Sequence, residues 1–329
     1  MDPYLYRLIR FIILLSCLIP SFICYLLVFF FLFKTKQITT QHLHHHFIFA
    51  LLICNFIFIT TELPITLVLS YQGYVSLQSD QFCSFWVVYN YALDVIGLLL
   101  TAFGSIERYF LIFHERFVHR WRHVVHYPFI LFCFIYPLIF YGMIVTMYPC
   151  ENVYYYDVFV CGGACYQYQT ILGTSDYLTH MFAPVAVIVL ANMILLFRVM
   201  KQKRTMKIAN TWCKNRLIYI QLVSISILYF VSWIPLVIVS LIRLFYDPLF
   251  LQDLLTLLLY YCIYIAPLAS PFISLVGLPA VRQRLIQTVW SIIGIHRVND
   301  NRIRPIASII TRSRRQNIKS HQQQDEHMF

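Results

Sequence analysis

Seven long apolar stretches divide this chain, and polar segments separate them. They lie near residues 8–33, 47–70, 83–113, 125–148, 177–200, 217–242 and 254–278. Each stretch can form a helix of roughly 20 residues, the length that crosses a bilayer. Helices are the expected element because hydrocarbon offers no water to backbone groups and because the stretches lack the alternation of barrel strands. The pattern therefore predicts an all-α membrane protein with a seven-transmembrane helix bundle.

The composition fits a chain that lies mostly in a bilayer. Hydrophobic residues make up 60% of the chain and charged residues only 12%, whereas soluble domains are roughly 25% charged. A water-soluble fold would leave part of this apolar surface facing solvent. The first stretch exceeds the core of about 7–15 residues that secretory signal peptides have, so we interpret it as the first span.

Positive charge predicts the orientation of the spans. If the N-terminus lies outside, all 25 Lys and Arg residues fall on the inner side except Arg7, Arg10 and Arg243. Cytoplasmic loops carry such an excess. The sequence therefore predicts a multi-pass plasma-membrane protein with an extracellular N-terminus and a cytoplasmic C-terminus. The net charge of +11 reflects this topology and contact with the lipid bilayer, and no nucleic-acid-binding fold accompanies it.

Three motifs lie in the third, sixth and seventh stretches. The third begins at Cys83 and ends in Glu107-Arg108-Tyr109, about 25 residues or roughly 37 Å of helix later. The sixth contains Phe230-Val231-Ser232-Trp233-Ile234-Pro235, and the seventh contains Ser270-Pro271-Phe272-Ile273-Ser274. Over residues 8–293 the chain resembles the rhodopsin-like (class A) G-protein-coupled receptors, as a divergent member similar to the neuropeptide receptors.

This resemblance implies a receptor domain over residues 1–293, with a short amphipathic helix after the seventh span. The cytoplasmic tail, residues 294–329, has a polar composition that predicts disorder. An extracellular ligand would shift the chain toward a state in which the inner ends of helices five and six are open. That state would activate a heterotrimeric G protein, and arrestin is a further expected partner.

The resemblance also implies which residues couple and switch the receptor: Glu107, Arg108, Tyr109, Asn215, Trp233, Pro235 and Pro271. Glu107 is expected to hold Arg108 in the inactive state, and Asn215 replaces the acid that often holds this arginine from helix six. Asn55 replaces the acid that binds sodium in the family, with Gly97 and Ser270 facing it. We expect insensitivity to sodium and raised basal activity.

Four cysteines lie in or beside polar connections of the oxidising outer side. The family bonds the cysteine at the outer end of helix three, here Cys83, to one in the loop before helix five. That loop contains Cys150, Cys161 and Cys165, and four cysteines allow three pairings. We favour Cys83–Cys165 with Cys150–Cys161, and Cys83–Cys161 is the rival. The Tyr-rich segment 149–176 is expected to form a β-hairpin lid.

Two acids, Glu62 and Asp94, lie within the apolar stretches, where a charge is costly and usually functional or paired. Either they receive a cationic group of the ligand, or they are protonated, hydrogen-bonded core residues. Asn90 takes the place of the acid that grips amine transmitters in the family, which argues against an aminergic receptor. Arg243 either grips a ligand carboxylate or carbonyl or pairs with Asp247. We predict a short basic peptide as ligand, and the predicted ligand-binding residues are Glu62, Asn90, Asp94, His180, Trp233 and Arg243.

We predict no metal site, no cofactor and no enzymatic activity. Adjacent histidines at 44–46 cannot all face one site on a helix, and the chain lacks the metalloprotease, phosphate-loop and nucleophile-elbow motifs. Two other functions stay open. One is a transporter or channel that uses Glu62 and Asp94, and the other is a seven-helix scaffold that does not signal.

Overall fold

The computed structural model describes residues 3–34, 43–113, 126–202, 209–247, 249–277 and 282. Within these ranges seven helical segments are long and apolar enough to cross a membrane, and none of the described residues forms a strand. We number them span one to span seven: Tyr4–Lys34, His46–Gln72, Asp80–Phe110, Tyr127–Met147, Thr170–Leu195, Val223–Phe245 and Gln252–Leu275. The predicted fold class is confirmed. The largest shift at a span start is in span five, which begins at Thr170 rather than near residue 177.

Four spans are single helices, and three are interrupted. The single helices are α1 (Pro3–Lys34), α4 (Asp80–Phe113), α6 (Tyr127–Met147) and α9 (Ala209–Phe245). Span two runs through α2 (Leu43–Ile57), η2 (Phe58–Glu62) and α3 (Leu63–Gln72); span five through α7 (Thr170–Asp176), η6 (Tyr177–Phe182) and α8 (Ala183–Gln202); span seven through α10 (Gln252–Leu254), η7 (Leu255–Leu259), α11 (Tyr260–Cys262) and α12 (Ile265–Gly277). The segments η2, η6 and η7 are π-helical turns.

Prolines account for two of these interruptions. Pro64 and Pro184 each follow a π-helical turn directly, at the second residue of the α-helix that comes next. A proline has no N–H to donate and its ring clashes with the preceding turn, so the helix widens there. Pro235 and Pro271, two of the predicted switching residues, lie inside α9 and α12.

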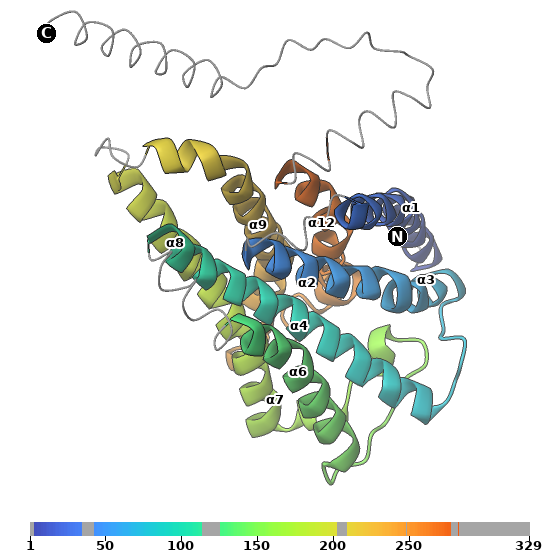
Figure 1. The fold of residues 1–329 in the computed structure, drawn as a ribbon. Helices are drawn as coiled ribbons and strands as arrows, with labels where there is room; N and C mark the ends of the chain where they lie inside the picture. Colours follow the sequence, from blue (N-terminus) through green and yellow to red (C-terminus); the bar gives the residue numbers. More distant parts are fainter. Residues whose placement is uncertain are drawn as a thin grey trace, which may run out of the picture. The chain divides into compact units, whose positions relative to one another are not determined.

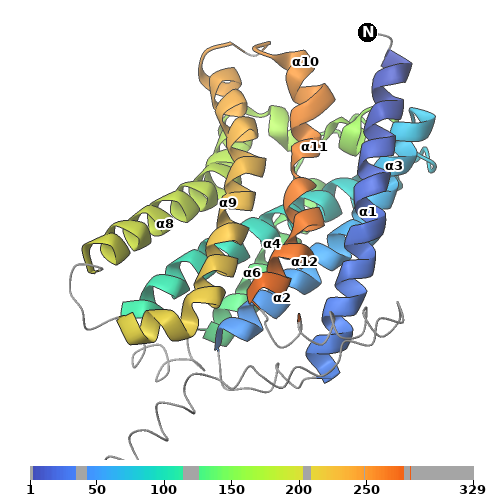
Figure 2. The same cartoon turned by 90° about the horizontal axis from the view of Figure 1, so that it is seen from above.

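Helix α4 is the centre of the bundle. It packs against α2, α6, α8 and α9, and 61% of its apolar segment is buried, compared with 22% of that of α6. Gly104 allows Phe47 of α2 to pack directly on α4, because a Cβ there would lie 2.2 Å from the Phe47 ring. Helix α12 packs against both α9 and α1, and Figures 1 and 2 show it between those two helices.

Two disulfides close one end of the bundle, which we call the disulfide end. Cys83 bonds to Cys161, and Cys150 bonds to Cys165. The pairing Cys83–Cys165 that we favoured from the sequence is therefore wrong, and its rival is correct. The backbone N–H of Cys165 donates to the side-chain Oδ1 of Asn152 at 2.8 Å. This bond ties residue 165 to the beginning of the loop, beside Cys150, and leaves Cys161 for Cys83.

The loop at the disulfide end is not a β-hairpin. Two short 3₁₀ turns, η4 (Phe159–Gly162) and η5 (Cys165–Tyr168), replace the predicted strands. Val160 and Cys161 have φ values of 50° and 51°, and their side chains are fully enclosed against α4 and α6. The loop therefore packs against α4 and α6 and covers this end of the bundle.

The opposite end carries Arg108, and we call it the Arg108 end. The predicted amphipathic helix near residues 281–293 and the predicted tail, residues 294–329, lie outside the described residues apart from Arg282. The domain boundary after residue 293 stays a prediction.

The two disulfides should contribute unequally to stability. Cys83–Cys161 closes 78 residues and Cys150–Cys165 closes 15. In the chain-entropy description the longer loop contributes about 1–1.5 kcal/mol more. We expect Cys83→Ala to lower the thermal unfolding temperature in detergent more than Cys150→Ala does. Peptide mapping without reductant should recover the two pairs named here, and recovery of a Cys83–Cys165 peptide would contradict them.

Candidate functional site

Buried polar side chains gather in two clusters inside the bundle. The Glu62 cluster, toward the disulfide end, consists of Glu62, Thr66, Trp86, Asn90 and Tyr264. The Arg108 cluster consists of Ser105, Arg108, Asn192 and Ser226. Both draw side chains from spans that are distant in sequence, so each depends on the packing around α4.

The carboxylate of Glu62 is enclosed by donors. Its Oε1 accepts hydrogen bonds from the Tyr264 hydroxyl at 2.9 Å, Asn90 Nδ2 at 3.0 Å, the Thr66 hydroxyl at 3.1 Å and Trp86 Nε1 at 3.3 Å. The side chain is fully buried, and Oε2 has no partner among the described residues. Four donors offset much of the cost of burying a carboxylate. The geometry favours the core-residue interpretation of Glu62 over direct contact with a ligand.

Asp94 lies one helical turn beyond Asn90 on α4, and its environment differs from that of Glu62. It is half-buried, and no hydrogen bond or ion pair joins it to another described residue. A carboxyl group without a hydrogen-bonding partner is costly inside a span, and a cationic group beside Asp94 would offset this cost.

His180 belongs to a third network, between spans four and five and the loop. Its Nδ1 contacts Asp176 Oδ1 at 2.7 Å, and its Nε2 contacts the Tyr136 hydroxyl at 2.7 Å. Asp176 also accepts hydrogen bonds from Tyr141 and Tyr166. Burial and the charge of Asp176 raise the pKa of the Tyr166 hydroxyl well above its usual range, so this hydroxyl stays a donor. The network fastens the loop to the bundle.

The other predicted ligand-binding residues are dispersed. Trp233 is buried in the middle of α9, at 3% exposed. Arg243 near the end of α9 bonds to Gln252 of span seven, and it forms no ion pair with Asp247 among the described residues. Only Glu62 and Asn90 of the predicted set bond to each other directly.

Arg108 is buried, at 1% exposed, and is held by uncharged groups. Its Nη2 donates to Ser226 Oγ at 2.6 Å, its Nε donates to the Gly104 carbonyl at 3.0 Å, and its Nη1 donates to Asn192 Oδ1 at 3.3 Å. Ser105 accepts a longer bond of 3.4 Å. These partners lie on α4, α8 and α9, so one guanidinium connects three helices.

The predicted ion pair between Glu107 and Arg108 is not among the contacts of the described residues. Glu107 Oε1 instead lies 2.5 Å from His126 Nδ1, just before α6, and both side chains are buried. Consecutive helical residues do not face each other, so Glu107 points toward α6 while Arg108 points toward α8 and α9. The Arg198 guanidinium carbon lies 5.0 Å from the centroid of the Tyr109 ring.

Asn215, predicted to hold Arg108 from helix six, lies on α9, but its side chain is outside the described residues. Its role as a lock on Arg108 stays a prediction.

A short polar connection lies between the two clusters. Asn55 Nδ2 donates to Ser270 Oγ at 2.9 Å, and the Tyr229 hydroxyl donates to Asn55 Oδ1 at 2.8 Å. A Cβ at Gly97 would lie 3.1 Å from that hydroxyl. The predicted proximity of Asn55 to Ser270 is confirmed. The amide is neutral, and its two ends are engaged by protein groups rather than offered to a cation.

Several residues of the two clusters, of the His180 network and of the Glu107 contact were not predicted from the sequence. They are Thr66, Trp86, His126, Asp176, Ser226 and Tyr264. For Trp86 a signal exists, because Trp86, Asn90 and Asp94 recur every four residues and so share one face of a helix. Ser226 and Tyr264 lie inside apolar stretches and have no comparable signal in one sequence.

Residues 11–273 match the model of one protein family, described as the seven-transmembrane receptors of the rhodopsin family. This match covers most of the chain and all seven spans in part or in full. Among curated proteins, none matches the chain.

The Glu107–His126 contact should be visible as an energetic coupling. His126→Phe leaves a buried carboxylate without its partner, which costs about 1–3 kcal/mol, whereas His126→Phe combined with Glu107→Leu removes both polar groups. We expect the single variant to unfold at a lower temperature in detergent and the double variant to recover part of the loss. Strictly additive effects in this double-mutant cycle would contradict the contact.

Proposed function

Because the chain belongs to the rhodopsin family of seven-transmembrane receptors, we propose that it binds an extracellular ligand at the disulfide end and activates a heterotrimeric G protein at the Arg108 end. The activating movement opens the ends of α8 and α9 there. One observation carries this proposal: among the described residues, the buried Arg108 guanidinium bonds only to neutral groups, and these lie on α4, α8 and α9.

The partners of Arg108 support a switch that opens at low cost. A buried charge is most stable with an opposite charge beside it, but Arg108 has serine and asparagine partners and a backbone carbonyl. Moving α9 outward breaks the bond to Ser226 and exposes the guanidinium to the cytoplasmic side. Pro235 lacks an N–H and weakens α9, which allows the Ser226 half to move as a unit.

The orientation in this proposal rests on charge and on sulfur chemistry. In the sequence, most Lys and Arg residues fall in the segments that adjoin the Arg108 ends of the spans, a bias typical of cytoplasmic loops. Disulfides form and persist in oxidising compartments, which supports an extracellular disulfide end. The N-terminus is then outside, the C-terminus is inside, and arrestin is a second partner at the Arg108 end.

We further propose that the ligand is a short peptide, of the neuropeptide kind, whose cationic group contacts Asp94. Asp94 is half-buried and free of hydrogen bonds to described residues, whereas the donors around Glu62 leave only its enclosed Oε2 without a partner. Glu62 thus acts indirectly, by holding Asn90, which lies one helical turn from Asp94 on α4. This assigns direct contact to one acid of the pair predicted from sequence.

Signalling without ligand tests the switch. In cells that express the intact chain, we expect G-protein activation above a mock control, and Arg108→Ala should abolish it. Ser226→Ala removes one bond of about 1 kcal/mol between α4 and α9, so it should raise the basal signal up to about five-fold. Arg108→Ala and Ser226→Ala, both in the Arg108 cluster, should therefore change the basal signal in opposite directions.

Surface labelling must show equal amounts of each variant. A chain that reaches the surface and signals no more than the mock control contradicts the switch. Ionic current or substrate uptake on expression would then favour a transporter or channel that uses Glu62 and Asp94. Silence in all of these assays would favour a scaffold.

Asp94 is tested with peptides. A pool of short peptides ending in Lys or Arg should contain one that activates the chain, and Asp94→Asn should raise its half-maximal concentration roughly 10-fold to 150-fold, the range for a hydrogen bond to a charged group. Asp157→Asn removes an exposed acid at the same end and should change nothing. An unchanged response of Asp94→Asn to the active peptide would rule out Asp94 as its contact.

A further inference from the structure

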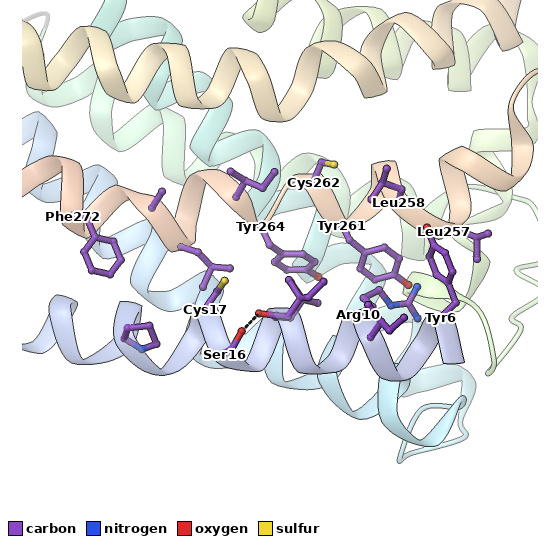
Figure 3. A pocket seen from close by; sticks show the side chains of 17 residues that line it. Tyr6, Arg10, Ser16, Cys17, Leu257, Leu258, Tyr261, Cys262, Tyr264 and Phe272 are labelled. Carbon is purple, nitrogen blue, oxygen red and sulfur yellow. Dashed lines mark hydrogen bonds between the residues drawn. The ribbon is translucent and has the colours of Figure 1, made fainter. Parts of the chain in front are cut away.

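An apolar groove of about 690 Å³ lies between α1 and span seven, and it borders the Glu62 cluster at Tyr264. Figure 3 shows its length: Tyr6, Arg10 and Tyr261 lie toward one end and Phe272 lies at the other. Exposed aliphatic residues such as Ile9, Ile13 and Ile265 line its walls. Because these residues lie on membrane spans, the groove opens toward lipid rather than toward the interior of the bundle.

One charged residue lines this groove. Of the 17 described residues that line it, Arg10 alone is ionised at neutral pH. Its Nε donates to Ser70 Oγ at 3.1 Å, and its guanidinium lies 3.8 Å from the ring centroid of Tyr261. No described carboxylate is within ion-pair distance, so the two Nη groups keep donors for another acceptor.

The neighbouring Arg7 has a different position. It lies against Gly73, the left-handed residue that ends α3, where a Cβ would collide with the guanidinium. A cation at the C-terminus of a helix is stabilised by the helix dipole. Arg7 therefore faces the end of α3, where its Nε has no partner among the described residues, whereas Arg10 lines the groove.

The position of Arg10 is costly without an anion. Arginine is disfavoured in hydrocarbon, and Arg10 also opposes the rule that places positive charge on the cytoplasmic side. Long arginine side chains near a span end usually extend toward the lipid headgroups. Here Ser70 and Tyr261 hold the guanidinium against spans two and seven, at the head of the groove.

We propose that this groove takes up a single-chain anionic amphiphile from the bilayer, such as a long-chain fatty acid, with its carboxylate on Arg10 and its chain directed toward Phe272. A volume of about 690 Å³ lies within the roughly 300–1,000 Å³ of pockets that hold one small molecule, which favours one chain over a two-chain phospholipid. Bilayer and groove are equally apolar, so the headgroup rather than the chain determines selection.

The site gives the membrane an influence on the receptor. Span seven forms one wall of the groove, and its helix α12 packs against α9, the helix that carries Ser226. A chain wedged between α1 and α12 therefore acts on a neighbour of the moving helix, and Asp94, the proposed peptide contact, is not among the residues that line the groove. This inference does not depend on the ligand proposed above.

Photolabelling of the full chain tests the site. The protein is placed in phosphatidylcholine nanodiscs and labelled with a diazirine analogue of palmitic acid, and the labelled peptides are mapped. Label should concentrate on groove-lining positions of residues 3–34 and 252–277. Arg10→Gln should reduce it roughly ten-fold, because a hydrogen bond to a charged group is lost, and Arg10→Lys should retain most of it.

Two pairs of controls separate charge from shape. The corresponding diazirine alcohol lacks the negative charge, so its labelling should not respond to Arg10→Gln. Ser16→Trp fills the groove and should reduce labelling by both probes, whereas Ile12→Trp places the same side chain on α1 outside the lining and should not.

Three results would overturn the proposal. The first is label spread evenly over the lipid-facing sides of other spans. The second is acid labelling unchanged in Arg10→Gln. The third is loss of label when phosphatidylglycerol replaces phosphatidylcholine, because an anionic bilayer phospholipid would then be the occupant. Thermal unfolding of each variant shows that it is folded, and Arg10→Lys serves as the charge-retaining variant if Arg10→Gln does not fold.

Discussion

Water is absent from the hydrocarbon layer, so every polar group inside the bundle depends on the protein for its hydrogen bonds. This constraint explains why the buried polar residues form clusters instead of being scattered. Glu62 collects four donors on one oxygen, and Arg108 collects acceptors from three helices. Each cluster fixes the register of several spans, because sliding one helix along another would leave a buried donor or acceptor without its hydrogen-bond partner.

The same constraint makes the clusters suitable as switching elements. Ser226, Tyr229 and Trp233 follow one another along α9, and the first two bond to Arg108 and to Asn55. Asn55 bonds in turn to Ser270 of α12. A displacement of α9 therefore breaks the bonds of Ser226 and of Tyr229 at the same time. Such a joint exchange favours two discrete positions of the helix over a continuous range of positions. The proposed switch uses this network to couple a movement of α9 to spans two and seven.

The fold was predictable from the sequence because span length and charge bias act on single segments. Partners across the bundle were less predictable, because they depend on how segments pack. Glu107 illustrates this: its neighbour in sequence is Arg108, yet helical geometry turns it toward His126. The prediction of the disulfide pairing failed for a similar reason, since one hydrogen bond from the backbone N–H of Cys165 to Asn152 positions Cys165. Trp86 could have been predicted, because it shares a helix face with the predicted residues Asn90 and Asp94.

Arg10 and Arg108 present the same problem in two settings. Each is a cation among apolar spans without an acid partner in the described chain. For Arg108, the interior supplies neutral acceptors, and the remaining deficit favours a state in which the guanidinium reaches an aqueous or protein surface. For Arg10, the groove supplies one serine and one aromatic ring, and the deficit is met most directly by an anion that arrives through the membrane. A seven-helix bundle can thus place a cation without an acid partner at the position where a partner is to bind.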